Sequence, residues 1–338
     1  MRKDKSNYCK RVPPIVMARP PGPREARPED KPDPTTQPPH VSAANESYVR
    51  LGGPRARAMT ILIWLHFALA IASPAYAGEA KPQRVMSLNL CADQLVLMLV
   101  APSRIASVSF LSRASEKPLL TAEAAGVRVN YGTLEEVLAQ KPDLVIAGIA
   151  STPTTREFLK RGAIPLVEVP VATNFDEIRK TTRLVGRAVG EEAKADALIR
   201  ELDATLAELQ SARLSRRIIV ADWGGGGEVS GKGTLFDAIL TAAGGVNLAD
   251  SMRDQKFGSF DFEQLLALNP DIIAFGDGST EKPGLRHEQI QHRIVQSVYR
   301  NRQITYPESL YACGLPQSAE AAKALRRAML EIVERSGR

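Results

Sequence analysis

The sequence predicts an α/β protein of two Rossmann-like lobes, each with a parallel sheet, joined by a single long helix. Three observations lead to this prediction. Short apolar runs typical of buried strands alternate with helical segments through most of the chain. One helix–strand unit occurs twice, 128 residues apart. Residues 174–214, which separate the two copies, have an almost wholly helical pattern.

The first 58 residues are not expected to fold. They hold 11 of the 23 prolines in the chain. Proline-rich, charged sequence with few aromatics cannot bury enough apolar surface to offset its conformational entropy. We therefore interpret residues 1–58 as a disordered leader, with Met59 as the alternative start of the protein.

Residues 59–77 have the three-part sequence pattern of a secretory signal peptide. Arg55 and Arg57 supply positive charge just before an apolar run, and Ala75 and Ala77 give a small-residue cleavage site. A membrane anchor is the alternative, but the run is shorter than the roughly 20 residues that a spanning helix needs. No cysteine follows the cleavage site, so a lipoprotein is not expected. The pattern predicts export to the periplasm.

If the protein is exported and its N-terminal part removed, the net positive charge of the chain is removed with it. The whole chain has 44 Lys and Arg against 38 Asp and Glu, but the excess of six lies in residues 1–58. The part that begins at Gly78 is balanced, with 32 of each. It lacks the basic character on which nucleic-acid binding depends, so no nucleic-acid partner is expected.

Residues 78–173 form the predicted N-terminal lobe and residues 215–338 the C-terminal lobe. Apolar strand candidates in the first are RVMSLNL, RIASVSF, PDLVIAG and IPLVEVP, with helical segments between them. In residues 174–214, Gly190 separates two helical stretches. The second stretch, of roughly 22 residues at about 1.5 Å each, spans roughly 33 Å, the width of a small domain.

The repeat aligns residues 134–148 with residues 262–276 without gaps. In both copies a helix ends before a proline and a buried strand follows. The matched pairs include Glu135 with Glu263, Pro142 with Pro270, and Asp143 with Asp271. A shared unit on each side of a helical segment favours two similar lobes.

The glycine-rich stretch ADWGGGGEVSGKGT partly resembles a phosphate-binding P-loop. Gly226, Gly231 and Lys232 fit that pattern, but Gly233 stands where the Mg²⁺-binding Ser or Thr belongs. Export also separates the protein from ATP. We interpret the stretch as a ligand-contacting loop at the carboxyl end of the first strand of the C-terminal lobe.

The chain resembles the periplasmic substrate-binding proteins of ABC importers that take up cobalamin, ferric siderophores or haem. The resemblance covers about residues 84–335 and rests on the order of RVMSLNLCADQLVLML, LEEVLAQKPDLVIA, GKGTLFDAILTAAGGVNLAD, FDFEQLLALNPDIIAFG and YACGLPQSAEAAKALRRAML. It implies two lobes bridged by a rigid helix with the ligand between them, and a monomer without enzymatic activity or cofactor. The implied partners are an ABC permease dimer with its ATPase, and a metal chelate or corrinoid.

The resemblance also implies a docking role for Glu135 and Glu263, which would pair with arginines of the permease. Their equivalence in the repeat suits a two-fold symmetric partner. The alternative is that both acids only favour a helix N-terminus electrostatically.

Ligand contacts are expected after the strands of both lobes, from aromatic rings that offer flat apolar area and arginines that clamp carboxylates or catecholates. For several of these residues a core or surface position is the alternative. The candidates are Asn89, Phe110, Arg113 and Tyr131 in the N-terminal lobe, and Trp223, Arg253, Arg286 and Tyr311 in the C-terminal lobe.

Histidine and cysteine limit the metal chemistry. Beyond Gly78 the chain has only His287 and His292, too few for a three-histidine site, so no metal-ion site is expected. His287 as an axial haem ligand stays open beside a plain surface position. Cys91 and Cys313 form an even pair in an oxidising compartment, near the expected cleft rim. A disulfide and two buried thiols are the alternatives.

Two other functions compete with transport. An exported hydrolase would need a nucleophile–base pair, but the chain has no G-x-S-x-G elbow and neither His287 nor His292 follows a strand. A ligand sensor that docks to a receptor would have the same fold as a transport protein.

Overall fold

The computed structural model describes residues 80–336, apart from 114–118, 163, 213, 224–227, 252–256, 260 and 278–284. The predicted leader and signal peptide lie outside these residues. Among the helices of the described part, none combines the length and apolarity needed to cross a membrane.

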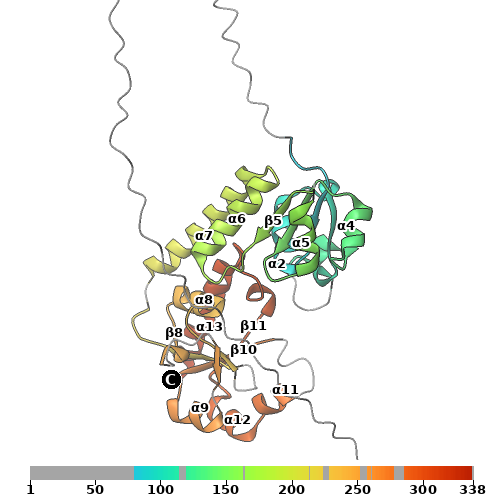
Figure 1. The fold of residues 1–338 in the computed structure, drawn as a ribbon. Coiled ribbons are helices and arrows are strands. Elements are labelled where there is room, and N and C mark those ends of the chain that lie inside the picture. The colour runs from blue at the N-terminus through green and yellow to red at the C-terminus, as the bar shows by residue number, and fades with distance from the viewer. Residues whose placement is uncertain are drawn as a thin grey trace, which may run out of the picture. The chain divides into compact units, whose positions relative to one another are not determined.

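Strands and helices together form the N-terminal lobe (Figure 1). Its five-stranded parallel sheet has the order β3-β2-β1-β4-β5. The chain starts in the middle, builds two strands to one side, and then crosses to the other side. The point where the order reverses therefore lies between β1 and β4. The strands are β1 (Val85–Ser87), β2 (Ile105–Ser109), β3 (Val129–Asn130), β4 (Leu144–Gly148) and β5 (Leu166–Val169). The helices are α2 (Leu90–Leu99), α3 (Thr121–Ala124), α4 (Leu134–Gln140) and α5 (Pro153–Arg161), with 3-10 turns η1 (Pro102–Arg104) and η2 (Phe110–Ser112).

The C-terminal lobe has a four-stranded parallel sheet in the order β11-β10-β6-β8, and a separate antiparallel pair, β7 with β9. Its strands are β6 (Ile219–Asp222), β7 (Glu228–Ser230), β8 (Val246–Asn247), β9 (Phe257–Ser259), β10 (Ile272–Gly276) and β11 (Gln303–Tyr306). Its helices are α8 (Leu235–Ala243), α9 (Phe262–Leu268), α11 (Leu285–Ile290), α12 (Arg293–Tyr299) and α13 (Ser318–Ser336), with turns η3 (Leu248–Ser251) and η4 (Glu308–Leu310). The prediction of two parallel α/β lobes is confirmed.

Two helices lie between the lobes in sequence, α6 (Phe175–Ala188) and α7 (Glu192–Ser211). Gly190, with φ of +69°, makes the tight turn between them. The 20 residues of α7 correspond to a length of about 30 Å. Ala195, near its start, belongs to the core of the N-terminal lobe, and Leu209, near its end, to a core of the C-terminal lobe. The long helix is therefore shared by both cores.

The two repeat copies begin in the same way, with a capping box. Thr133 and Glu136 cap α4, and Asp261 and Gln264 cap α9, each pair satisfying backbone N–H groups that a helix start leaves unpaired.

Both copies also end in the same way, which explains the shared Pro-Asp pair. A left-handed residue, Lys141 or Asn269, closes each helix before the proline. The following carboxylate then accepts hydrogen bonds from the start of the neighbouring strand: Asp143 from the Gln83 backbone N–H at 2.6 Å, and Asp271 from that of Ile219 at 2.7 Å. The aspartate of each copy thus fixes the start of the central strand of its sheet.

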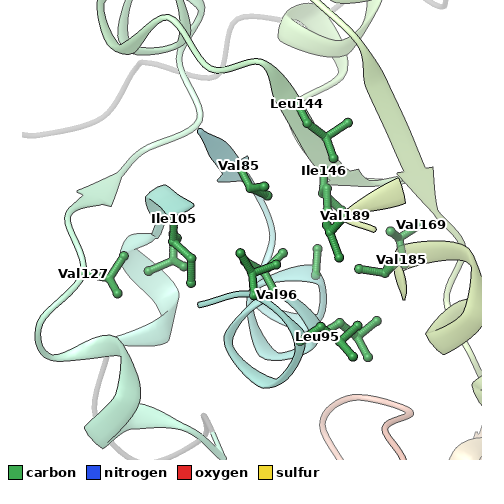
Figure 2. Packing of buried hydrophobic residues seen from close by; sticks show 14 of the residues in the cluster. Val85, Leu95, Val96, Ile105, Val127, Leu144, Ile146, Val169, Val185 and Val189 are labelled. Carbon is green, nitrogen blue, oxygen red and sulfur yellow. The ribbon is translucent and has the colours of Figure 1, made fainter. Parts of the chain in front are cut away.

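Apolar residues from the sheet and from α6 form the main core of the N-terminal lobe (Figure 2). Val85 and Ile146 lie on neighbouring strands and pack with Val96 of α2. Val185 and Val189, at the end of α6, complete this cluster. Because α6 contributes to the core, it belongs structurally to the N-terminal lobe.

A disulfide between Cys91 and Cys313 links segments 222 residues apart, with Cα atoms 5.3 Å apart. Cys91 lies in α2, and Cys313 follows the last strand of the C-terminal lobe. Cys313 and Leu315 are nevertheless buried in the core of the N-terminal lobe. Gly314 permits this return, since a Cβ atom there would lie 2.3 Å from the carbonyl oxygen of Ala172. We name residues 312–316 the return segment.

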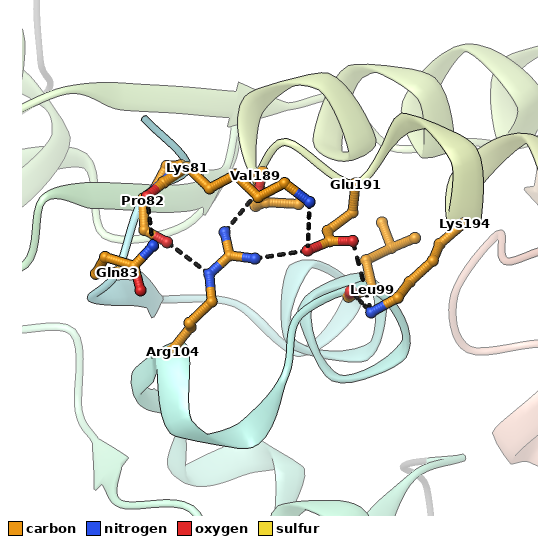
Figure 3. Close-up of polar contacts among 8 residues, drawn as sticks. All are labelled: Lys81, Pro82, Gln83, Leu99, Arg104, Val189, Glu191 and Lys194. Carbon is orange, nitrogen blue, oxygen red and sulfur yellow. Dashed lines mark hydrogen bonds and ion pairs between the residues drawn. The ribbon is translucent and has the colours of Figure 1, made fainter. Parts of the chain in front are cut away.

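Arg104 joins the start of the described chain to the α6–α7 turn (Figure 3). Its guanidinium donates to the carbonyl oxygens of Pro82 at 2.8 Å and Val189 at 2.6 Å, and to the Glu191 carboxylate at 2.6 Å. Partial burial opposes the charge of Glu191, but the hydrogen bond from Lys81 and the nearby cations outweigh burial and hold the pKa of Glu191 below its usual value.

Arg104→Ala should lower the free energy of unfolding by roughly 2–3 kcal/mol, because it removes the cation of a largely buried pair and leaves two carbonyl groups without a donor. Lys81→Ala is the control: Lys81 binds the same carboxylate, but its side chain is 52% exposed. Its loss should cost less than about 1 kcal/mol. Urea unfolding measures both variants.

The same unfolding experiment has a pH dependence. The lowered pKa of Glu191 means that its contribution is complete above its unfolded-state pKa and is lost as the pH falls through its folded-state value. The difference between wild type and Arg104→Ala should therefore shrink in acid. An undiminished difference would contradict the role given to the pair.

Replacing Cys91 and Cys313 together by Ala should lower the free energy of unfolding by about 2–5 kcal/mol, because the cross-link restricts the unfolded chain over a long loop. Reduction of the wild type by dithiothreitol should have a similar effect and should leave the double variant unchanged. Equal stability of the oxidised and reduced wild type would contradict this prediction.

Candidate ligand-binding cleft

A cavity of about 340 Å³ lies between residues of the two lobes. Its N-terminal side comes from the carboxyl ends of β1, β4 and β5, and its C-terminal side from the start of α8 and the end of the lobe's last strand-to-helix connection. Open parallel sheets bind ligands at this edge, next to the reversal of strand order. The lining residues are Asn89, Cys91, Leu95, Gly148, Ile149, Ala150, Val169, Pro170, Val171, Ala172, Thr173, Thr181, Gly233, Thr234, Leu235, Tyr311, Ala312, Cys313 and Gly314.

None of these described lining residues is charged. The wall is mostly aliphatic, with an amide from Asn89, hydroxyls from three threonines and Tyr311 as its polar groups. Both cysteines of the disulfide take part in the wall, one from each lobe. An uncharged wall favours an apolar ligand whose polar groups accept or donate hydrogen bonds without carrying net charge.

Asn89 lies at the reversal of strand order, between β1 and α2. Its side-chain oxygen accepts from the backbone N–H groups of Cys91 and Ala92 and so caps α2. Gly148, at the end of β4, lets this side chain approach, since a Cβ atom there would lie 2.9 Å from the Asn89 Cγ. Asn89 is thus held rigidly at the cavity wall.

Large apolar side chains continue along the same edge of the N-terminal sheet. Each follows the carboxyl end of a strand and is exposed: Phe110 after β2, Tyr131 after β3, Ile149 after β4 and Val171 after β5. The rings of Phe110 and Tyr131 stack with centroids 5.1 Å apart. We name these four residues the apolar edge. Exposed apolar groups gathered in this way are typical of a binding surface.

Arg113, a predicted ligand clamp, has another role. Its guanidinium donates to the carbonyl oxygens of Ala124, Ala125 and Val127. These bonds hold the loop that leads into β3, so the side chain has a structural role, and its role as a ligand contact stays a prediction.

Trp223 is also reassigned. It is 1% exposed and belongs to a core of the C-terminal lobe with Val229 and Ile273. A large indole directly after a buried strand gains more from burial than from exposure at a loop. Tyr311, by contrast, lines the cavity, and its contact with a ligand stays a prediction. Arg253 and the side chain of Arg286 lie outside the described residues.

The two histidines lie in different local environments. The His292 side chain accepts from the Ile294 backbone N–H and caps α12, while His287 lies in α11. In the described part of the chain, no group of three or more His, Cys, Asp and Glu side chains is arranged to hold a metal ion.

An aromatic wall behind Tyr311 was not predicted. The ring of Tyr311 packs against Tyr306 in a tilted arrangement with centroids 4.2 Å apart, and Phe236 packs against Tyr306 at 5.6 Å. The Tyr306 hydroxyl donates to Asp222 at 2.8 Å. Burial raises the pKa of Asp222 to about 6 and raises the pKa of Tyr311, so this phenol keeps its proton at neutral pH. The available sequence signal was an aspartate at the end of the strand IIVAD.

Glu135 and Glu263 lie in the first turns of the equivalent helices α4 and α9. Both side chains are exposed. Their placement is therefore compatible with contact by a partner molecule.

Comparisons with known proteins give related sequences of limited identity. A cobalamin-binding protein of Halobacterium salinarum is 28% identical over 206 residues, which cover 59% of this chain and 55% of that protein. The chain thus spans about half the length of this relative. The uncharacterized ABC transporter substrate-binding lipoprotein YvrC of Bacillus subtilis is 23% identical over 60% of this chain and 67% of its own.

Solved structures share the fold. The haem-binding protein RhuT of Roseiflexus sp. RS-1 superposes with a TM-score of 0.62 at 22% identity, over 74% of this chain and 98% of that one. The vitamin B12 binding protein BtuF of Vibrio cholerae gives 0.58 at 18% identity, over 75% and 98%.

The sequence pattern of the periplasmic binding proteins matches residues 85–306, from the first strand of the N-terminal lobe to the last strand of the C-terminal lobe. The match includes both sheets, both repeat copies and the helix that their cores share. The chain therefore belongs to the periplasmic binding protein family.

Proposed function

We propose that this protein captures a corrinoid between its lobes outside the cytoplasm and delivers it to an ABC import permease. The observation that carries the proposal is the uncharged, largely apolar cavity at the carboxyl edge of the N-terminal sheet. The signal-peptide grammar, the family membership and the related substrate-binding lipoprotein support a periplasmic location.

Cavity chemistry favours a corrinoid over the two other ligand classes. A corrinoid brings its own axial ligands to cobalt and carries a rim of neutral amides, which suits an apolar wall with an amide and hydroxyls. Haem carries two carboxylates, and many ferric siderophores are anionic. Among the described lining residues no cation is present to pair with them.

Tyr311 further disfavours haem. A phenol binds ferric iron as phenolate, but burial and the nearby Asp222 charge raise the pKa of Tyr311. The neutral phenol is better suited to stacking and to hydrogen bonding with an amide. The cobalamin-binding relative points in the same direction.

Purified protein should bind cyanocobalamin more tightly than haemin or a ferric hydroxamate siderophore, with a Kd of about 1 μM or lower. Isothermal titration calorimetry measures all three ligands. Stronger binding of haemin or of the siderophore would replace the corrinoid by that class.

Tyr131→Ala should weaken cyanocobalamin binding by about tenfold, because a stacked ring of the apolar edge loses its contact area with the ligand. Phe158→Ala is the matched control, since Phe158 is an exposed ring that lies within α5 and is not part of the apolar edge. It should bind as the wild type does. Equal effects of the two substitutions would place the ligand elsewhere.

Docking to the permease is assigned to Glu135 and Glu263, one on each lobe. Their exposure and their equivalent positions in the repeat support this role. Exposed charge pairs contribute little affinity individually but fix register and speed association.

The double variant Glu135→Ala, Glu263→Ala should lose corrinoid uptake while its ligand affinity stays unchanged. Glu331→Ala, at an exposed acid of α13, is the control and should support normal uptake. Labelled cobalamin uptake by cells that carry each variant as the sole copy measures the effect. Normal uptake with the double variant would refute the docking assignment.

A further inference from the structure

Asp222 joins three strands of the C-terminal lobe at their cavity-side ends. It is the last residue of β6 and is 8% exposed. One carboxylate oxygen accepts from the hydroxyl of Tyr306, the last residue of β11, at 2.8 Å. The other accepts from the hydroxyl of Ser230, the last residue of β7. Both oxygens of this buried group are therefore used to fix neighbouring side chains.

The Tyr306 ring is the middle of a three-ring cluster. The ring centroid of Tyr311 lies 4.2 Å from that of Tyr306 in a tilted arrangement, and the ring of Phe236 in α8 lies 5.6 Å from Tyr306 and 6.0 Å from Tyr311. Only Tyr311 among the three borders the cavity. Asp222 is therefore linked to the cavity wall in two steps. It binds the hydroxyl of Tyr306, and the ring of Tyr306 packs against the ring of Tyr311.

We propose that Asp222 is a positioning residue for the ligand cavity, which fixes the cavity-facing ring of Tyr311 by anchoring the hydroxyl of Tyr306. This inference rests on the proposed function, because the position of Tyr311 matters only if the ligand contacts it. It adds a residue that does not itself touch the ligand.

The charge of Asp222 sets the strength of the anchor. Burial raises the pKa of Asp222 to about 6. The hydrogen bonds from Ser230 and Tyr306 lower the pKa, but burial has the larger effect. The carboxylate of Glu308, from η4, also raises it. Burial keeps the pKa of the Tyr306 phenol well above its usual value, so Tyr306 remains the donor. When Asp222 takes up a proton, a charge-assisted hydrogen bond becomes a weaker neutral one.

The first experiment measures cyanocobalamin affinity of the full chain from pH 5 to pH 8. Wild-type affinity should fall by about fivefold as the pH drops through about 6, because the anchor weakens. Asp222→Asn and Tyr306→Phe should bind with the reduced affinity at every pH. Tyr306→Phe retains the ring, so its effect isolates the hydroxyl.

Ser230→Ala is the matched control, because Ser230 bonds to the same carboxylate but lies outside the ring cluster. The variant should retain the pH step, but with its midpoint at a higher pH. In the wild type the hydrogen bond from Ser230 lowers the pKa of Asp222, so its removal should raise that pKa. A general structural defect would not shift a midpoint in this direction. A flat wild-type profile, or wild-type affinity in both Asp222→Asn and Tyr306→Phe, would overturn the proposal.

A second measurement does not need a ligand. With ¹³C-labelled tyrosine rings, the NMR signals of Tyr306 and Tyr311 in the free protein should titrate with a midpoint near pH 6 and should not do so in Asp222→Asn. Tyr306→Phe and Tyr311→Phe assign the two signals. Absence of cyanocobalamin binding together with this titration would contradict only the choice of ligand. Absence of the titration would overturn the positioning role.

Discussion

The burial of one helix by two cores is the constraint on which the described architecture depends. Ala195 and Leu209 of α7 belong to different lobes, and Leu202 between them packs with Ile178 of α6 and Ala319 of α13. A helix resists bending because each turn is held by its own backbone hydrogen bonds. The two lobes therefore have a rigid connection rather than a flexible linker.

The cavity follows from that connection together with the parallel strands. Every strand of both main sheets is parallel to its neighbours, so the loops after the strands gather at one edge of each sheet. On the N-terminal side these loops present an uncharged wall and exposed apolar rings. On the C-terminal side, Asp222 lies behind the wall and accepts hydrogen bonds from Tyr306 and Ser230. The described wall thus offers a ligand shape and neutral polar groups rather than ion pairs.

Periodicity and the internal repeat predict the two-lobe fold, because each can be recognised from short stretches of sequence without knowledge of long-range contacts. The Pro-Asp units could be located, and the structure adds the reason for the aspartate, which ties the start of the central strand. Asn89 and Tyr311, which the sequence offers as ligand contacts because each follows a strand end, both line the cavity, and their contact with a ligand stays a prediction.

Other parts of the site could not be predicted from local pattern. Whether an aromatic ring after a strand turns outward or inward depends on the neighbouring layer, so Trp223 and Tyr131 have similar sequence contexts and opposite exposures. Arg113 is engaged by carbonyl groups of a loop that the sequence does not place nearby. Asp222 and Tyr306 are 84 residues apart and meet only through the sheet order.

The return segment has a consequence for the order in which the molecule assembles. Leu315 fills part of the first lobe's interior, although it follows β11, the last strand of the second lobe. The core of the first lobe therefore stays incomplete until the chain has been made as far as Leu315, so the first lobe cannot be completed ahead of the second.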